Sequence, residues 1–433
     1  MIVNYVRDAT RDSPVNIAVA RVVLAGYLVW KTLPYDWLLV AQAPFAGFAT
    51  YRFAIPPWPE LLVVEKWLLM ALLCCFAVGY RIRVTALGAA LIVGHFGMVR
   101  FVLNTSGGAT ALFFSAWYLL FFALYAGDET DGLSVDAVRR TGTQSLDELR
   151  AVLKDDGGKR TYTMAPLRWS LLAFAIIYFG SGVSKLYTAG LAWFAPSNLS
   201  QNLYFFNVVG THPLGIGAAL VEYPLVVGAL AVGTVVLEVG LLLVILLGLP
   251  VWPVVLGLLG MHTGVALFMG IVFFDVVPMF ALFVAWDRLY ARAVRTDRLD
   301  VVYDEFCYFC SRSLYPFKLL DVNGTVRFHS QSDLPRQYRE RDGRDGIDFD
   351  RAMYAFRDGV AYEGYDAFRQ LLRQFTVFAP LAWVMGRAPV RAVGERIYRH
   401  VAANRSQYFV CRVALDDPES ASATEQTEYR STR

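Results

Sequence analysis

The segment LDVVYDEFCYFCSRSLYPFKLL, residues 299–320, decides how the C-terminal part of the chain folds. Its apolar run of β-branched and aromatic residues at 301–303 predicts a short strand, and an amphipathic helix is expected from about Tyr308. Cys307 and Cys310 therefore lie where a strand passes into a helix. Unpaired backbone N–H groups and the helix dipole at such a junction favour a thiolate on the first cysteine. The spacing of three residues brings Cys310 within disulfide reach, which predicts a dithiol redox site.

Two other interpretations of the cysteine pair stay open: a zinc site and a purely structural pair. Zinc needs further Cys or His ligands, normally a second pair. The other cysteines of the chain and the nearest histidine are Cys74, Cys75, Cys411 and His329. The sequence therefore predicts no metal site and favours redox chemistry over a structural role.

An ordered series of motifs begins at the cysteines and covers about 299–412. It comprises Val302-Tyr303-Asp304-x-x-Cys307-x-x-Cys310, Leu320-Asp321-x-x-Gly324, strands near 326–329 and 352–356, Glu363-Gly364-x-x-Ala367-Phe368, and Ile397-Tyr398-x-x-Val401-Ala402-x-Asn404-Arg405. This series resembles the DCC (DUF393) family of thiol–disulfide oxidoreductases. The resemblance implies a thioredoxin-like α/β domain in which Cys307 is the attacking thiolate and Cys310 the resolving thiol.

The chain departs from that family beside the first cysteine. The family usually has Gly after the Asp of the motif, whereas Glu305 follows Asp304 here. A carboxylate two residues before Cys307 disfavours its thiolate, and Asp304 acts in the same direction. We therefore expect a first thiol that is less reactive than the family resemblance implies.

The composition indicates a membrane protein. Of the 433 residues 56% are hydrophobic and only 18% are charged, whereas soluble proteins carry about 25% charged residues. A bilayer core takes about 20 apolar residues per helix. On this rule the candidate spans are 15–33, 60–79, 84–103, 109–126, 167–187, 224–248, 251–270 and 272–291.

Basic residues give these spans an orientation. They gather before the first span, in the even-numbered loops and after the last span, where Arg288, Arg292, Arg295 and Arg298 stand. Cytoplasmic loops carry an excess of Lys and Arg, so we expect a multi-pass protein of the cell membrane with both termini cytoplasmic.

Ionisable residues inside spans are costly and are functional candidates by default. Arg21, His95, Glu238 and His262 lie deep in expected spans, and Lys185 lies near the end of one. The alternative for each is a buried pair or hydrogen bond that fixes helix packing, with Glu238 as the expected partner of Lys185.

A second series of motifs surrounds this lysine. It comprises Tyr178-Phe179-x-x-Gly182-Val183-x-Lys185-Leu186 with Trp193 after it, Ala20-Arg21, Asn104, and His262 before an apolar hairpin. Over about 10–290 the chain resembles the HTTM fold shared with vitamin K-dependent γ-carboxylases. The resemblance implies Lys185 as a catalytic base and a quinone as the candidate cofactor. The family's histidine after the Asn is replaced by Thr105, so carboxylation itself is not expected.

We therefore expect an α-helical polytopic domain of about eight transmembrane helices over 1–293, with a cytoplasmic loop at 127–164. A capping box, Ser145-x-x-Glu148, predicts a short helix in that loop. A DCC-type thioredoxin-like domain follows over 294–415, and the polar tail 416–433 is expected to be disordered.

Three functions compete for this architecture. The first is a membrane-tethered thiol–disulfide oxidoreductase, whose partner would be a redox protein or a small thiol. The second is a carboxylase-related membrane enzyme of quinone or lipid chemistry centred on Lys185, and the third is a non-catalytic scaffold or carrier. The lipid bilayer is a partner in all three, and no nucleic-acid partner is expected because basic and aromatic residues do not interleave on one soluble face.

Overall fold

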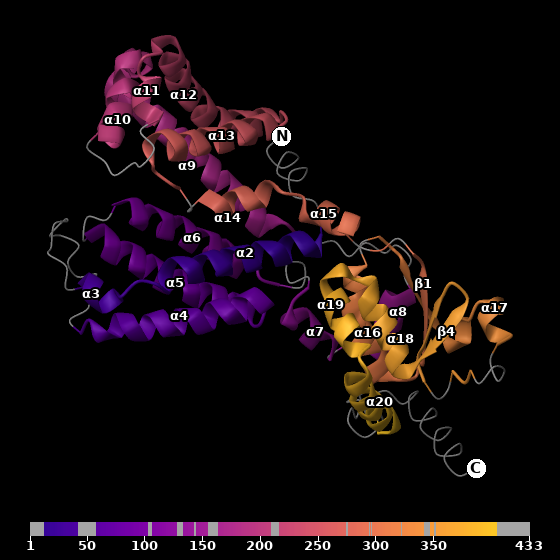
Figure 1. Cartoon of the computed structure of the whole chain (residues 1–433). Coiled ribbons are helices and arrows are strands. Elements are labelled where there is room, and N and C mark those ends of the chain that lie inside the picture. The colour runs from indigo at the N-terminus through magenta and orange to yellow at the C-terminus, as the bar shows by residue number, and fades with distance from the viewer. Residues whose placement is uncertain are drawn as a thin grey trace. The chain divides into compact units, whose positions relative to one another are not determined.

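The structure is a computed structural model of the 433-residue chain. It describes residues 13–41, 58–102, 106–127, 133–142, 144–154, 163–208, 216–273, 276–293, 295, 297–321, 323–341, 347–349 and 352–404. The chain forms two compact units, a helical unit and a sheet unit (Figure 1). The helical unit is Met1–Asp136 with Arg160–Arg288, and the sheet unit is Ala137–Lys159 with Leu289–Arg433.

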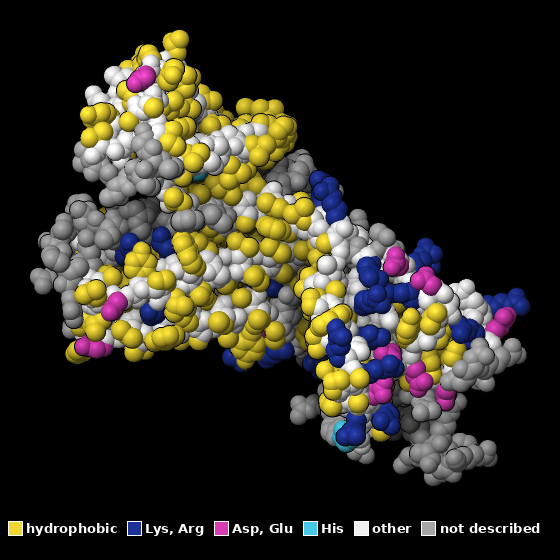
Figure 2. All heavy atoms as spheres, viewed as in Figure 1, with side chains coloured by type: hydrophobic (Ala, Val, Ile, Leu, Met, Phe, Trp, Pro, Cys, Tyr) yellow, Lys and Arg dark blue, Asp and Glu magenta, His cyan; other side chains and the backbone are white. Residues whose placement is uncertain are grey.

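Six described helices of the helical unit are long and apolar enough to cross a bilayer. They are α2 (Pro14–Thr32), α4 (Glu60–Val78), α5 (Ile82–Val102), α9 (Ala165–Ala189) with its 3-10 extension η2 (Gly190–Phe194), α12 (Pro224–Leu247) and α13 (Trp252–Met269). Many of their apolar side chains face outward: Trp67 is 60% exposed and Leu225 88%. Hydrophobic side chains also cover much of the visible face of this unit in Figure 2. Such a surface suits a bilayer, because large apolar patches are rare on proteins that face water.

Two of the eight expected spans differ from these helices. The expected span 109–126 falls on α6 (Ser106–Leu124), whose described apolar part, Leu112–Leu124, is short for a bilayer crossing. The expectation of one span over 272–291 is wrong. The chain there forms α14 (Val277–Phe280), η4 (Ala281–Phe283) and α15 (Trp286–Ala293). The physical reason is that Val284 is extended, with ψ of 126°, which interrupts the helical hydrogen bonds.

Capping residues set several helix ends in this unit. The Ser13 hydroxyl accepts a hydrogen bond from the backbone N–H of Val15 at 3.3 Å, and Pro14 begins α2. Three long helices end at glycines in the left-handed conformation, namely Gly79, Gly248 and Gly270. Other short described helices of the unit are α3 (Trp37–Ala41), α10 (Pro196–Val208) and α11 (Ile216–Leu220). A further short helix, α7 (Val135–Thr141), contributes to both units.

The sheet unit contains four strands in the order β2-β1-β3-β4. They are β1 (Leu299–Tyr303), β2 (Val326–Ser330), β3 (Tyr354–Arg357) and β4 (Val360–Glu363). β1 pairs in parallel with β2, whereas the β1–β3 and β3–β4 pairs are antiparallel. The parallel register aligns Tyr303 with Ser330, so β1 and β2 end at the same edge of the sheet. The strand expected at 301–303 is confirmed.

Helices connect and cover these strands. They are α16 (Tyr308–Leu320), α17 (Arg336–Arg339), α18 (Gly364–Gln374), α19 (Ala379–Met385) after a short 3-10 turn η6 (Thr376–Phe378), and α20 (Ala388–Ala403). Alternation along β1 divides the core in two. Leu299, Val301 and Tyr303 join one buried cluster with residues of α16 and α18, whereas Val302 joins a second cluster on the other face.

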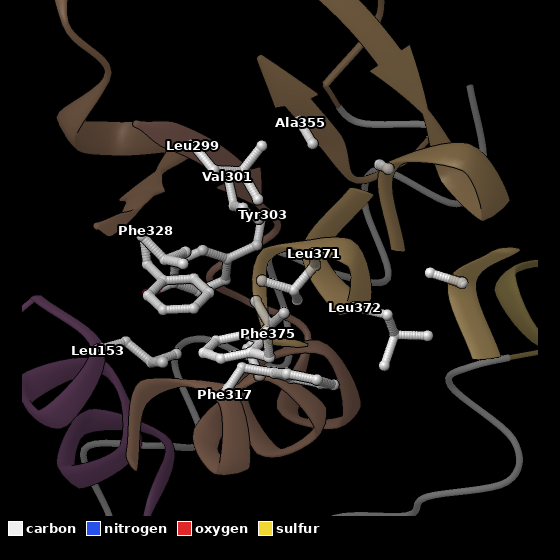
Figure 3. Close-up of a cluster of buried hydrophobic side chains, with 14 residues drawn as sticks. Leu153, Leu299, Val301, Tyr303, Phe317, Phe328, Ala355, Leu371, Leu372 and Phe375 are labelled. Atoms are coloured by element: carbon white, nitrogen blue, oxygen red, sulfur yellow. The ribbon is translucent and has the colours of Figure 1, made fainter. Parts of the chain in front are cut away.

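A helix from the loop between α6 and α9 completes the first cluster. The expected capping box is present: the Glu148 N–H donates to Ser145 Oγ at 3.2 Å, and the Ser145 N–H donates to Glu148 Oε2 at 2.8 Å. The helix it starts, α8 (Leu146–Lys154), buries Leu153 beside Phe317 and Phe375 (Figure 3). The sequence placed this loop with the membrane domain, whereas in the structure Ala137–Lys159 packs as part of the sheet unit.

Candidate active site at the start of helix α16

The two cysteines lie at the junction between β1 and α16. Cys307 is the N-cap residue of α16, in an extended conformation with φ −89° and ψ 102°. Its Sγ accepts a hydrogen bond from the backbone N–H of Cys310 at 3.1 Å. The two side chains form a disulfide, with their Cα atoms 5.2 Å apart. Cys307 thus receives the N-terminal N–H that would stabilise a thiolate at this position.

A tight turn presents the pair. The Asp304 carboxylate accepts a hydrogen bond from the backbone N–H of Phe306 at 2.9 Å, and the Asp304 carbonyl accepts one from the N–H of Cys307 at 3.3 Å. These bonds fold the chain back directly before α16. Phe306 is 74% exposed at the tip of the turn, next to Cys307. The turn therefore places an aromatic side chain on the surface beside the first sulfur.

Glu305, the residue that departs from the family pattern, is buried at 4% exposure. Its carboxylate accepts hydrogen bonds from the backbone N–H of Ser332 at 3.1 Å and from Ser332 Oγ at 2.8 Å. The acid therefore ties the turn before α16 to the segment that follows β2. Its role is structural as well as electrostatic, because removing it would leave the Ser332 groups without these bonds.

Arg150 of α8 holds the same turn from another side. Its Nε donates to the carbonyl oxygen of Glu305 at 2.8 Å, and its guanidinium lies 5.0 Å from the ring centroid of Phe306. Asp147, one turn earlier on α8, accepts from Arg150 at 3.0 Å. Arg150 thus adds a positive charge and a backbone contact to the loop that carries Cys307. This contribution was not expected from the sequence.

Tyr303, the last residue of β1, belongs to the buried hydrophobic cluster directly before the turn. It is 1% exposed, and its hydroxyl has no hydrogen-bond partner among the described residues. Burial, with a smaller contribution from the charge of Glu305, raises the pKa of Tyr303 to about 12, although Arg150 opposes the shift. Tyr303 is therefore neutral at physiological pH and does not add charge near the cysteines.

A second polar group lies on the other face of the sheet. His329 Nε2 lies 2.7 Å from one oxygen of Asp300, and the Tyr338 hydroxyl donates to the other oxygen at 2.9 Å. Burial by itself raises the pKa of Asp300, but these hydrogen bonds and the charge of His329 outweigh burial. The net pKa of Asp300 is therefore below its usual value. This cluster links β1, β2 and α17 but contains no cysteine.

The helical unit brings together two of the other predicted residues. Lys185 on α9 and Glu238 on α12 form an ion pair in which Lys185 Nζ lies 2.8 and 2.7 Å from the two carboxylate oxygens. Ser181, one turn before Lys185, accepts from Nζ at 2.9 Å and donates to Glu238 at 3.3 Å. Glu238 is 5% exposed. The lysine therefore has the partner that the packing interpretation requires.

The remaining predicted residues of this unit are distributed over several contacts. His262 on α13 makes a short hydrogen bond with Tyr178, which precedes Ser181 by one turn on α9. His95 bonds Glu65 at 2.7 Å between α5 and α4. Arg21 is fully buried and donates to the carbonyl of Leu133 at 2.8 Å. Asn104 lies outside the described residues. The predicted ionisable residues that the structure describes thus lie in several separate contacts.

Two features of the site were missed from the sequence: Arg150 and Ser332. The signal for Arg150 was indirect. α8 has a capping box and two buried leucines four residues apart, Leu149 and Leu153, so the helix needs an apolar partner. Nothing in the spacing identifies that partner. Among the described residues, no group of three or more His, Cys, Asp or Glu side chains is arranged to hold a metal ion.

Comparison with known proteins shows a family similarity for most of the C-terminal part of the sheet unit. Residues 301–411 match the family model for DCC1-like thiol-disulfide oxidoreductase. The match begins in β1 and includes both cysteines at the start of α16. The family match therefore supports a DCC1-like thiol-disulfide oxidoreductase domain at residues 301–411. No curated protein and no solved structure matches the chain. The family match does not extend to the long apolar helices, where the HTTM resemblance stays a prediction.

Proposed function

We propose that the chain is a membrane-tethered thiol–disulfide oxidoreductase in which Cys307 attacks and Cys310 resolves. The observation that carries the proposal is the position of Cys307 as N-cap of α16, where its Sγ accepts the Cys310 N–H within the family-matched segment. A thiolate at this position gains the hydrogen bond and the favourable end of the helix dipole. Cys310 lies within the helix and is already within bonding distance.

The proposed reaction conserves electrons and atoms. In the reduced form, the Cys307 thiolate attacks one sulfur of a substrate disulfide and releases the other as a thiolate. Cys310, after losing its proton, attacks Cys307 Sγ in the mixed disulfide and releases the second substrate thiolate. Two electrons pass to the substrate, the Cys310 proton goes to one released thiolate, solvent protonates the other, and the Cys307–Cys310 disulfide remains. A second dithiol or two small thiols would then reduce that disulfide.

The proposed fold of the domain is thioredoxin-like. Support comes from the strand order β2-β1-β3-β4, with β1 and β2 parallel and β3 and β4 antiparallel to their neighbours. Cys307 lies between β1 and the first crossover helix, α16, and Cys310 lies in the first turn of that helix. Such a crossover places the helix start at the carboxyl edge of the strands, where ligands commonly bind in α/β folds.

The proposed location is the cell membrane, with both termini and the cysteine pair on the cytoplasmic side. The six long apolar helices support membrane attachment. The orientation rests on the basic residues of the even loops and chain ends. In a reducing cytosol the dithiol would rest mainly reduced and cycle through the disulfide.

A trapping experiment on the full-length chain tests the proposal. With Cys310→Ser, attack by Cys307 on a small aromatic disulfide should stop at the mixed disulfide, which mass spectrometry detects on Cys307. With Cys307→Ser, the same treatment should give little adduct at Cys310. Equal adduct formation on both variants, or none on either, would show that the pair is structural.

The carboxylase-related alternative places chemistry at Lys185 and a quinone in the helical unit. The ion pair does not favour it, because both oxygens of Glu238 and Ser181 Oγ already engage the amine. A base at Lys185 would first have to break this pair. The contacts support a packing role, in line with the scaffold hypothesis for the helical unit.

A further inference from the structure

The last two helices of the sheet unit carry a surface that no part of the redox site uses. From η6 through α20 many of the outward side chains are large and apolar. The most exposed of them are Val377 at 66%, Leu381 at 50%, Trp383 at 62%, Val393 at 57% and Ile397 at 59%. We call this set the α19–α20 face. In Figure 2 hydrophobic and basic side chains lie next to one another in this region of the sheet unit.

The geometry of α20 shows that this exposure is organised. None of its residues is fully buried, although Gly394 and Tyr398 lie on its partly covered side. Val390, Val393 and Ile397, spaced by three and four residues, form an apolar stripe on the exposed part of the helix. An amphipathic helix that leaves its apolar stripe in solvent has the pattern of a helix that lies at an interface.

The charge of the segment selects the kind of interface. Residues 376–404 contain four arginines, Arg387, Arg391, Arg396 and Arg399, and one acidic residue, Glu395. Arg391 bonds Glu395 at 2.8 Å, so the surplus is carried by the other three arginines. Arg387 lies 3.8 Å from the ring centroid of Trp383. Trp and Arg beside an apolar stripe are the composition of helices that bind anionic lipid surfaces.

The chain connections between the two units keep the sheet unit near the membrane that the long apolar helices would span. The sheet unit joins the helical unit through three chain connections, at residues 136–137, 159–160 and 288–289. The connection at 159–160 leads into the candidate span α9, which begins at Ala165, so only residues 160–164 separate the sheet unit from that helix. A chain of five residues spans at most about 18 Å. A domain tethered in this way to bilayer-spanning helices stays close to the lipid headgroups, which raises its effective concentration there.

We propose that the α19–α20 face docks on the anionic headgroup region of the bilayer. The apolar stripe enters the interface, and Arg387, Arg396 and Arg399 contact lipid phosphates. The proposal rests on the proposed membrane attachment of the chain but not on its redox chemistry. Docking would confine the sheet unit to the membrane surface.

The test uses the full-length chain in nanodiscs, with Cys74, Cys75 and Cys411 replaced by Ser and Cys307–Cys310 kept as the disulfide. Val393→Cys is labelled with the polarity-sensitive dye NBD, and Ala392→Cys serves as the matched exposed position outside the stripe. At position 393, emission should be at least about twofold brighter in phosphatidylcholine–phosphatidylglycerol discs than in phosphatidylcholine discs, because the dye leaves water for the interface. A nitroxide lipid should quench it there, and position 392 should change little.

Charge variants separate lipid binding from other causes. Arg396→Glu should reduce the fraction of docked domain by several-fold and 0.5 M salt should do the same, since each arginine contributes about fivefold to partition onto anionic lipid. Arg336→Glu on α17 makes the same charge change elsewhere and should have no effect. Hydrogen exchange of residues 388–403 in the unmodified chain gives an independent readout and should be slower in anionic discs.

Three results would overturn the proposal. The first is equal emission and exchange in both lipids without quenching. The second is slow hydrogen exchange of residues 388–403 in detergent that becomes fast when residues 405–433 are deleted, which would show that the chain's own tail covers the face. The third is protection that depends on protein concentration, which would indicate a second copy. Incorporation into the discs is scored separately, so a failure of membrane attachment is distinguishable from a failure of docking.

Discussion

Lys185–Glu238 in the helical unit and Cys307–Cys310 in the sheet unit are both close polar pairs, but their surroundings differ. In the first pair, Lys185, Ser181 and Glu238 all form hydrogen bonds with one another. Near Cys307, in contrast, Asp304 and Arg150 form hydrogen bonds with backbone groups of the turn, and Glu305 bonds Ser332. None of these bonds joins two charged side chains. The first arrangement neutralises charge between helices, and the second shapes a loop around a reactive atom.

This contrast distinguishes a packing pair from a reactive one. In the helical unit, the closed set of contacts predicts that loss of one member destabilises the bundle. In the sheet unit, Glu305 and Arg150 surround the cysteines without bonding to their sulfur atoms. Replacing either residue should therefore change the reactivity of Cys307 more than the stability of the fold. Variants of Lys185, Glu305 and Arg150 test this difference.

The largest effect on stability is expected at Lys185. Lys185→Met leaves Glu238 buried without its cation and should reduce the free energy of unfolding by about 3–5 kcal/mol. The double variant Lys185→Met/Glu238→Leu should recover much of that loss, because both charges are removed together. Thermal unfolding of the full chain in detergent measures both variants. Normal stability with loss of a quinone- or lipid-linked activity would instead identify Lys185 as a functional base.

Leu153 tests whether α8 is an integral part of the sheet unit. It is 1% exposed within the cluster that contains Phe317 and Phe375. Leu153→Ala should cost about 2–5 kcal/mol and should lower the melting temperature of the sheet unit. Lys154→Ala, at the next and exposed position, should change stability by less than about 0.5 kcal/mol. Equal, small effects of both changes would show that α8 is only a loosely attached loop.

The Asp300 cluster gives the sheet unit an acid-sensitive contribution. The folded pKa of Asp300 lies below its unfolded value of about 3.9. The contribution is therefore present above that unfolded value and is lost as the pH falls through the folded pKa. Asp300→Asn should cost about 1.5–3 kcal/mol at pH 7 and should flatten the acid side of the stability–pH curve. Urea unfolding at pH 3 to 7 measures this; an unchanged acid slope would contradict it.

The smallest effects are expected on the reactivity of Cys307. Glu305→Gln removes a negative charge and keeps atoms that can bond Ser332, so it should lower the thiol pKa by less than about one unit. Arg150→Gln should raise that pKa by a similar amount, and Arg150→Lys should restore part of it. Glu305→Gly restores the family residue but also removes the Ser332 bonds. Shifts of the same sign in the Gln variants would indicate a disordered turn instead of a charge effect.

Several features that depend on residues close together in the sequence were predicted correctly, whereas some contacts between distant positions were not. The strand at 301–303, the helix from Tyr308 and the capping box at Ser145 depend on neighbouring residues, and the structure confirms all three. The contact between Arg150 and Glu305 joins positions 155 residues apart, and no local pattern encodes it. The span expected at 272–291 shows that a local pattern can also mislead. Its apolar composition did not reveal that the helix is interrupted by the extended backbone at Val284.

The central claim is that Cys307 is an activated nucleophile, and the alkylation rate of the reduced full-length chain against pH tests it most directly. Mass spectrometry of iodoacetamide-treated protein reports Cys307, Cys310 and Cys411 separately. We predict that Cys307 reacts at least about tenfold faster than Cys310 at pH 7, with a pKa modestly below the free-cysteine value of about 8.5. A Cys307 that reacts no faster than Cys411 at any pH would contradict the oxidoreductase account.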